Sequence, residues 1–258
     1  MSAVVIDGHL VHYETLGRGR PVVFLHGWLG SWRYWMETMD EMSIHYRTYA
    51  FDFWGFGDSA KVAERYTVPH LVQQLEAFLD ALGIWKCDLV GHALGGLVAL
   101  GFGLRWPQRV GQVATVSLPF TEDAITPRLT KVNPTGVLDK VFRQRPLDYA
   151  ALRAEAERAD VQAIGRSIAS LKGLDLRGQK PPARWLAIHG EKDDIVRPPE
   201  PGSLRQDASR FRLILFDQGR HFPMLEETSK FNRLLKDFLA GDDLASLQIK
   251  EEWRRRTH

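Results

Sequence analysis

Short apolar runs rich in β-branched residues alternate with amphipathic helical patterns along most of the chain. Such alternation predicts an α/β fold, in which a doubly wound, mostly parallel sheet carries helices on its faces. Residues 4–6 and 9–14 are expected to form an opening hairpin. Further strands are expected at residues 21–25, 47–53, 88–90, 111–118, 184–189 and 211–216, and helices at 71–82, 94–105 and around 231–238.

The alternation of strands and helices stops between residues 119 and 182. Pro127, Pro134 and Pro146 punctuate the first half of this segment, and the second half is rich in residues that favour helices. A helical insertion between two strands is typical of a lid over the strand ends. We therefore expect an α/β core from residues 1–118 and 183–240, a helical lid at 119–182 and a polar C-terminal tail at 241–258.

Length and charge limit the classes of function. At 258 residues the chain is long enough for one sizeable α/β domain. Its 34 basic and 32 acidic residues nearly cancel, so bulk charge gives no reason to expect a nucleic-acid or membrane partner. The single cysteine, Cys87, excludes an intrachain disulfide and favours a reducing compartment. With no leader-like N-terminus and no apolar stretch near about 18–20 residues, we expect a cytoplasmic location.

Residues 88–96, Asp-Leu-Val-Gly-His-Ala-Leu-Gly-Gly, are the most informative stretch of the chain. They match the frame of a nucleophile elbow, in which a strand turns sharply into a helix and exposes one side chain at the tip. Gly91 and Gly95 stand two residues on either side, where a Cβ would collide with neighbouring elements. Ala93 occupies the position of the nucleophile, and its methyl group cannot attack a substrate.

The partners of such a nucleophile follow in the expected order. Acyl transfer through a hydroxyl needs a base and a carboxylate that orients the base, in the chain order nucleophile, acid, histidine. His221 follows the last predicted strand, and Asp193 and Asp194 follow the strand before it. We choose Asp193, because it comes three residues after Gly190 and precedes the apolar pair Ile195-Val196. Asp194 is the alternative.

Main-chain N–H groups are expected to form the oxyanion hole. Leu94 follows the nucleophile position at the start of a helix, whose dipole also favours negative charge. Trp28, in the loop after residues 21–25, is the natural second donor. Aromatic residues on the predicted loops indicate an apolar pocket, and we expect Trp28, Trp54 and Phe120 to contact substrate. His92, beside the nucleophile position, is expected to pack or to form hydrogen bonds behind the elbow.

Five stretches of the chain, at residues 26–30, 52–59, 91–96, 190–193 and 219–222, resemble those of capped, single-domain α/β-hydrolases. This family includes esterases, lactonases, carbon–carbon bond hydrolases and cofactor-free haloperoxidases. The resemblance implies an ester or related acyl substrate, small and partly apolar, and a serine–aspartate–histidine triad that forms an acyl-enzyme without a cofactor. Leu94-Gly95-Gly96 is similar to the serine branch rather than to the branch with an aspartate nucleophile.

Ala93 leaves three interpretations open. The nucleophile of a serine hydrolase has been removed by engineering, the protein is a natural receptor-like binder that does not hydrolyse its ligand, or His221 acts as a base without a covalent intermediate. We favour the first, because the other catalytic groups are present, and it predicts a loss on the order of 10⁶-fold in kcat. No G-x-G-x-x-G follows the first strands, which argues against dinucleotide binding. The histidines are dispersed, so no metal site is expected.

Overall fold

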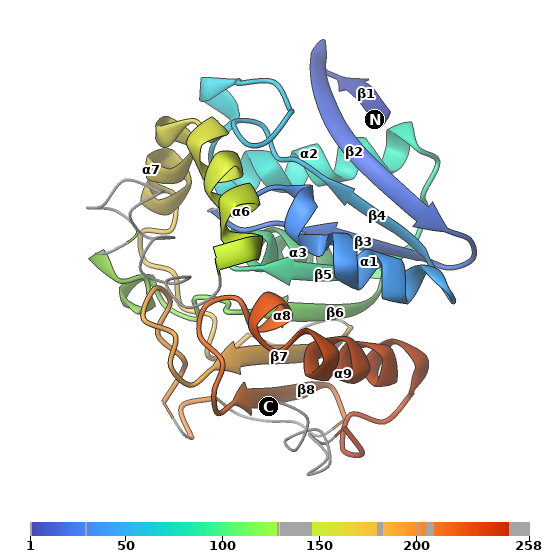
Figure 1. The fold of residues 1–258 in the computed structure, drawn as a ribbon, viewed down its shortest axis with the longest axis vertical. Helices are drawn as coiled ribbons and strands as arrows, with labels where there is room; N and C mark the ends of the chain where they lie inside the picture. Colours follow the sequence, from blue (N-terminus) through green and yellow to red (C-terminus); the bar gives the residue numbers. More distant parts are fainter. Residues whose placement is uncertain are drawn as a thin grey trace.

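The computed structural model describes residues 2–28, 30–127, 129, 146–179, 183–200, 202–204 and 209–247. Its eight-stranded sheet has the order β1-β2-β4-β3-β5-β6-β7-β8 (Figure 1). β2 pairs antiparallel with β1 and β4, and all other neighbours in the sheet are parallel. The predicted fold class is therefore confirmed. The strands are β1 (Ser2–Ile6), β2 (His9–Gly17), β3 (Pro21–Leu25), β4 (Arg47–Phe51), β5 (Cys87–His92), β6 (Val110–Val116), β7 (Arg184–Gly190) and β8 (Phe211–Phe216).

Helices cover both faces of the sheet, with α1 and α9 on one face and α2 and α3 on the other (Figure 1). Both faces of β3 and β5 are therefore covered: every residue of β5 is buried, and β3 is apolar along its whole length rather than alternating. The short helices η1 and α1, after β3, and α8, after β8, are absent from the sequence prediction. The helices of the core are α1 (Met36–Ser43), α2 (Val68–Ala81), α3 (Leu94–Arg105), α8 (Pro223–Glu226) and α9 (Thr228–Ala240), with the 3₁₀ turns η1 (Trp32–Trp35), η2 (Ala63–Arg65), η3 (Pro107–Arg109) and η4 (Glu122–Ala124).

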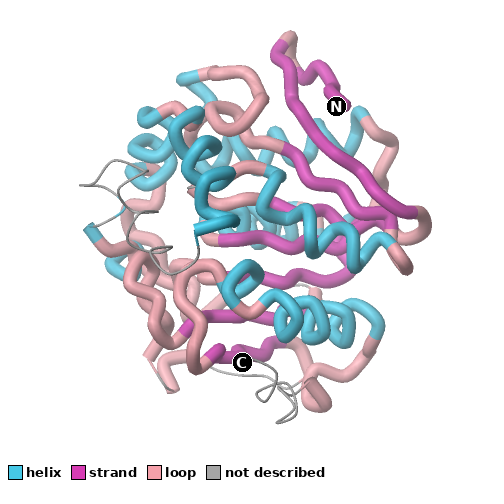
Figure 2. The backbone as a smooth tube through the Cα atoms, in the orientation of Figure 1, coloured by secondary structure: helices cyan, strands magenta, loops and turns pink. Residues whose placement is uncertain are grey.

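Two helices, α6 (Pro146–Arg158) and α7 (Val161–Ala169), are inserted between β6 and β7. They lie on the side where the parallel strands end, among the connecting loops (Figure 2). The main-chain N–H of Asp160, which caps α7, donates to the carbonyl oxygen of Gly55 at 2.7 Å, and the N–H of Val68 donates to Ser170 Oγ at 3.1 Å. The insertion is thus attached to the loop after β4 and to the start of α2. Residues 128, 130–145 and 180–182 of the predicted lid, and 248–258 of the predicted tail, lie outside the described residues.

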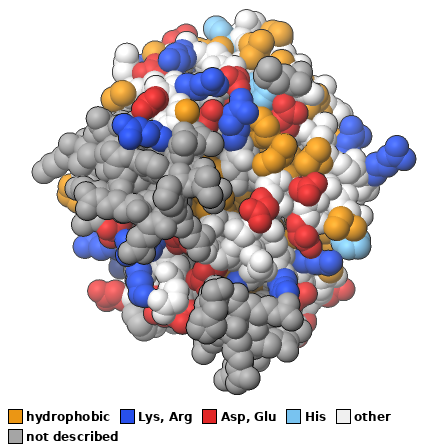
Figure 3. Space-filling view, viewed as in Figure 1, with side chains coloured by type: hydrophobic (Ala, Val, Ile, Leu, Met, Phe, Trp, Pro, Cys, Tyr) orange, Lys and Arg blue, Asp and Glu red, His pale blue; other side chains and the backbone are white. Residues whose placement is uncertain are grey.

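The surface carries charges of both signs. On the face viewed in Figure 3, basic and acidic side chains are interspersed around the described part of the molecule, in keeping with a net charge of +2. No helix among the described residues has the length and apolar character needed to cross a bilayer.

Candidate active site

The turn between β5 and α3 has the geometry that the glycine spacing predicts. Ala93 stands at its tip with φ 47° and ψ −105°, outside the regions that residues with a side chain normally adopt. A Cβ on Gly91 would overlap the carbonyl oxygen of Gly95, and a Cβ on Gly95 would overlap that of Leu25. Only glycine therefore fits at either position, because main-chain atoms occupy the space.

The strained residue is fixed from both sides by hydrogen bonds. The Ala93 N–H donates to the carbonyl oxygen of Val116 in β6 at 2.8 Å, and the Ala93 carbonyl accepts from the N–H of Leu97 at 3.2 Å. A residue in such a conformation costs on the order of 1–3 kcal/mol and persists only where its surroundings determine it. Residues held in this way cluster at functional sites, and this one presents a methyl group.

His221 and Asp193 form a hydrogen-bonded pair beyond the ends of β7 and β8. His221 Nδ1 donates to Asp193 Oδ2 at 2.9 Å. Asp193 Oδ1 accepts from the main-chain N–H groups of Ile195 at 2.9 Å and Val196 at 3.0 Å. Burial raises the pKa of Asp193, but the contacts with His221 and these donors outweigh it, and the pKa lies below its usual value. Asp193 is thus a charged acceptor that orients His221 and leaves Nε2 as its basic nitrogen.

The side chain hydrogen-bonded to His221 Nδ1 is that of Asp193. Asp194 uses its main-chain carbonyl oxygen to accept from Thr126 Oγ1 at 2.9 Å, which ties the segment after β6 to this loop. Of the two adjacent carboxylates, the structure therefore brings the preferred one to the histidine.

The two predicted oxyanion donors are available. Within the described part of the chain, the main-chain N–H groups of Trp28 and Leu94 donate to no protein acceptor. Leu94 is the first residue of α3, so its N–H points out of the positive end of a 12-residue helix. Both groups can therefore stabilise a negative oxygen without breaking an existing bond.

The three aromatic residues expected to contact substrate have different surroundings. The indole N–H of Trp28 donates to Ser167 Oγ in α7 at 2.9 Å, so its ring joins the loop after β3 to the insertion. Trp54 is buried, with the guanidinium of Arg65 5.7 Å above its ring. Phe120 stacks on Trp185 of β7, with centroids 5.6 Å apart. Contact of these three side chains with substrate remains a prediction.

Comparison with known proteins agrees with this geometry. Residues 20–164 match the family model described as "alpha/beta hydrolase fold". The chain belongs to the alpha/beta hydrolase fold family. It is 28% identical over 265 residues to a 2-hydroxy-6-oxo-2,4-heptadienoate hydrolase of Pseudomonas putida, covering 93% of this chain and 96% of that protein. It is 28% identical over 255 residues to a pimeloyl-[acyl-carrier protein] methyl ester esterase of Aeromonas salmonicida, covering 89% and 99%.

Solved structures show the same hydrolase fold. The enol-lactonase of Burkholderia xenovorans LB400 superposes with a TM-score of 0.81 at 21% identity, covering 93% of this chain and 100% of that one. An esterase of Exiguobacterium antarcticum superposes with a TM-score of 0.80 at 22% identity, covering 92% and 98%. At such identities the likeness establishes the fold of this hydrolase relative and leaves its substrate open.

Two structural roles in this hydrolase fold were not predicted from the sequence. Ser117, directly after β6, also has a positive φ of 48°, and its buried hydroxyl has no partner among the described residues. Because His92 pairs with Val116 in the sheet, the next residues, Ala93 and Ser117, lie at neighbouring strand ends. His26 donates from Nδ1 to the carbonyl oxygen of Gly27 at 2.8 Å and accepts from the N–H of Phe53 at 3.0 Å. This neutral imidazole joins the loops after β3 and β4.

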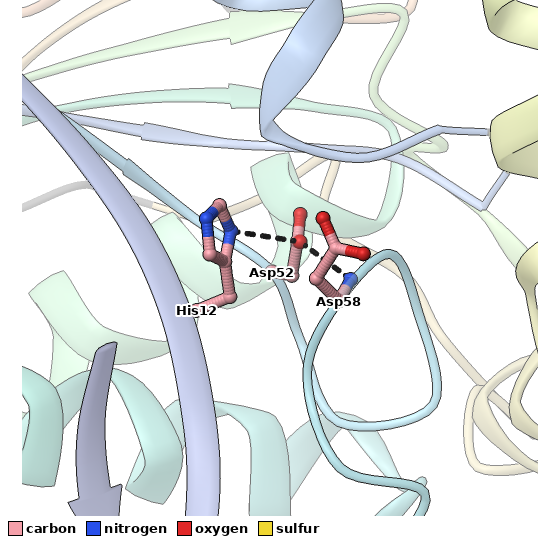
Figure 4. Close-up of side chains that lie close together, drawn as sticks. All are labelled: His12, Asp52 and Asp58. Atoms are coloured by element: carbon pink, nitrogen blue, oxygen red, sulfur yellow. Dashed lines mark hydrogen bonds and ion pairs between the residues drawn. The ribbon is translucent and has the colours of Figure 1, made fainter. Parts of the chain in front are cut away.

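His12, Asp52 and Asp58 lie close together and have the donor atoms of a metal site (Figure 4). The carboxylate of Asp52 accepts from the main-chain N–H groups of Trp32 at 2.8 Å and of Asp58 at 2.9 Å. Asp58 pairs with the guanidinium groups of Arg33 at 3.1 Å and Arg158 at 2.9 Å. The carboxylate oxygens of Asp52 and Asp58 thus already accept hydrogen bonds or ion pairs from the protein, and we interpret the cluster as a polar junction beside α6.

Proposed function

We propose that this protein carries the site of a serine-type hydrolase for an ester or related acyl substrate with an apolar portion, in a form without its nucleophile. The observation that carries the proposal is the conformation of Ala93, which is held in the strained geometry of an elbow although its side chain cannot react. The hydrogen-bonded pair of His221 and Asp193 and two unoccupied main-chain donors accompany it. These are the parts that acyl transfer requires, apart from one hydroxyl group.

The mechanism follows once a serine stands at position 93. His221 Nε2 takes the hydroxyl proton, the oxygen attacks the carbonyl carbon, and the N–H groups of Trp28 and Leu94 stabilise the oxyanion. His221 then gives its proton to the leaving group, and water releases the acyl group by the same steps. With Ala93 in place the carbonyl compound binds, but no acyl-enzyme forms.

The relatives support a carbonyl substrate without deciding its class. One is named as a hydrolase of 2-hydroxy-6-oxo-2,4-heptadienoate and the other as an esterase of a methyl ester, and both compounds contain a carbonyl group. The alternative is a natural binding protein that keeps its ligand unreacted, which the methyl group of Ala93 favours. A third reading gives His221 the role of a base without a covalent intermediate.

Ala93→Ser tests the proposal directly. We expect the variant to hydrolyse p-nitrophenyl esters, with an acyl-length profile that describes the pocket, and the unchanged chain to be slower on the order of 10⁶-fold in kcat. Ala93→Gly is the matched control, because it also changes the tip of the elbow but supplies no hydroxyl.

Two outcomes contradict the proposal. Equal hydrolysis by the unchanged chain and the serine variant means that no hydroxyl is needed, which points to His221 as a direct base. No turnover in either form, with an apolar ester still bound, points to a binding protein.

A further inference from the structure

A buried chain of hydrogen bonds joins the oxyanion loop to the catalytic histidine behind the elbow. The main-chain N–H of Gly27, the residue before Trp28, donates to the hydroxyl of Tyr34 in η1. The Tyr34 hydroxyl lies 3.0 Å from His92 Nδ1, and His92 Nε2 lies 2.8 Å from the main-chain oxygen of His221. The chain therefore connects three segments, the loop after β3, the elbow and the loop after β8.

The donors and acceptors fix the direction of this chain. The carbonyl oxygen of His221 only accepts, so His92 Nε2 carries the proton and a neutral His92 has an unprotonated Nδ1. The Tyr34 hydroxyl then donates to that nitrogen and accepts from Gly27. Burial lowers the pKa of His92 well below its usual value and raises the pKa of Tyr34, so both groups stay neutral. The donor and the acceptor of each hydrogen bond in this series are therefore fixed.

The surrounding packing leaves these two rings little freedom. A Cβ on Gly27 would lie 2.7 Å from His92 Nδ1, and a Cβ on Gly30 would overlap the ring of Tyr34. The His92 ring also lies 4.6 Å from that of His221 and 4.9 Å from that of Phe222, between centroids. The two glycines of the loop after β3 thus make room for the chain, and aromatic rings close its other side.

We propose that Tyr34 and His92 are positioning residues, which hold the main chain of His221 in register with the oxyanion loop. The inference rests on the proposed function, because it concerns the base and the donor of that site. Asp193 orients the imidazole of His221 through Nδ1, but it does not fix the distance between the histidine loop and Trp28. The Tyr34–His92 chain spans that gap, so a shift in either loop is passed to the other.

Kinetics in the Ala93→Ser background test the positioning role. We expect Tyr34→Phe and His92→Phe each to lower kcat by about 10–100-fold with little change in KM, because a misplaced catalytic group costs transition-state stabilisation. His92→Gln retains a donor near the position of Nε2 and should recover part of the loss. Tyr49→Phe is the control: Tyr49 in β4 is as buried as Tyr34, 5% exposed, and lies outside the chain. A loss equal to that of Tyr34→Phe would overturn the inference.

Proton NMR of the unchanged chain tests the same inference without activity. The proton between His221 Nδ1 and Asp193 should give a downfield resonance, assigned by its disappearance in Asp193→Asn. We expect Tyr34→Phe to shift or broaden it and Tyr49→Phe to leave it in place. An unaltered resonance in Tyr34→Phe and His92→Phe would refute the positioning role of Tyr34 and His92. A shifted resonance together with an inactive Ala93→Ser variant would instead support the positioning role and refute the proposed hydrolase function.

Discussion

Two buried carboxylates lie at opposite ends of the strands of the sheet and differ in how they are stabilised. We call the side where the parallel strands end the carboxyl edge and the side where they begin the amino edge. Asp193, beyond the carboxyl end of β7, is 5% exposed, and Asp88, near the amino end of β5, is 1% exposed. Burial raises the pKa of both side chains. At Asp193, His221 and main-chain N–H groups outweigh burial and the pKa falls below its usual value. At Asp88 the half-exposed guanidinium of Arg20, 3.0 Å away, does not, and the pKa is raised to about 6.

This difference shows that burial alone does not determine the charge of a carboxylate. Asp193 stays charged because fixed donors on its own loop and on the histidine replace water. At Asp88 the half-exposed Arg20 and one main-chain N–H, that of Gln112, do not compensate for the lost water, so its charged form lowers the stability of the fold. The carboxyl edge thus holds a preorganised charge beside the elbow. At the amino edge the charged form of Asp88 lowers the stability of the fold, and Asp88 has no role in the proposed mechanism.

Removing the charge at the carboxyl edge should have the largest effect. In the Ala93→Ser background, Asp193→Asn is expected to lower kcat on the order of 10⁴-fold, as in other triads, because the base loses its orientation and the stabilisation of its charged form. Steady-state ester hydrolysis measures this effect. Asp194→Asn is the control, and a similar loss there would mean that the wrong carboxylate has been assigned.

One added methyl group at each edge should cost more free energy of unfolding where it meets fixed main-chain atoms than where it meets a side chain that can move. Gly95→Ala places a Cβ against the carbonyl oxygen of Leu25, which cannot move, and should cost at least about 3 kcal/mol of the free energy of unfolding. Gly111→Ala meets the side chain of Asp88, which can rotate, and should cost about 1–2 kcal/mol. Urea unfolding measures both, and equal losses would contradict the contrast.

The charge at the amino edge should appear as a pH dependence of stability. The folded pKa of Asp88, about 6, lies above the ordinary value of 3.8, so between these values the folded protein holds more protons. Its free energy of unfolding therefore falls as pH rises from 4 to 6, by up to about 3 kcal/mol from this group. Asp88→Asn removes that contribution. The difference between variant and parent should grow over this range, and a difference independent of pH would refute the argument.

A third buried carboxylate, in the insertion, should give the smallest effect. Glu155 of α6 is also 5% exposed and pairs with Arg33 Nε at 3.0 Å. Because Arg33 is partly exposed, Glu155→Gln should cost about 1 kcal/mol at low salt and less in 1 M salt, where charges are screened. Glu157→Gln, on the exposed side of α6, is the control. The same loss at both salt concentrations would mean that packing rather than charge holds α6.

The features that the sequence predicted are those encoded by adjacent residues. Strands, the glycine spacing of the elbow and the motifs at strand ends are local, so the sheet and the positions of Ala93, Asp193 and His221 followed from reading along the chain. The hydrogen bonds that join Tyr34 and His92 could not be predicted in this way, because they depend on how three loops meet in space. The backbone strain at Ser117 and the raised pKa of Asp88 likewise arise from tertiary packing. The helix α1 was missed because its few apolar residues form only a short stripe.

Covalent labelling tests the central claim most directly, that the site lacks a single hydroxyl. The unchanged chain, the Ala93→Ser variant and the double variant Ala93→Ser/His221→Ala are incubated with a fluorophosphonate probe and compared by intact-mass spectrometry. We expect one phosphonyl adduct on Ala93→Ser and none on the other two within the same time. Equal labelling of the unchanged chain, or no labelling of a folded Ala93→Ser variant, would contradict it.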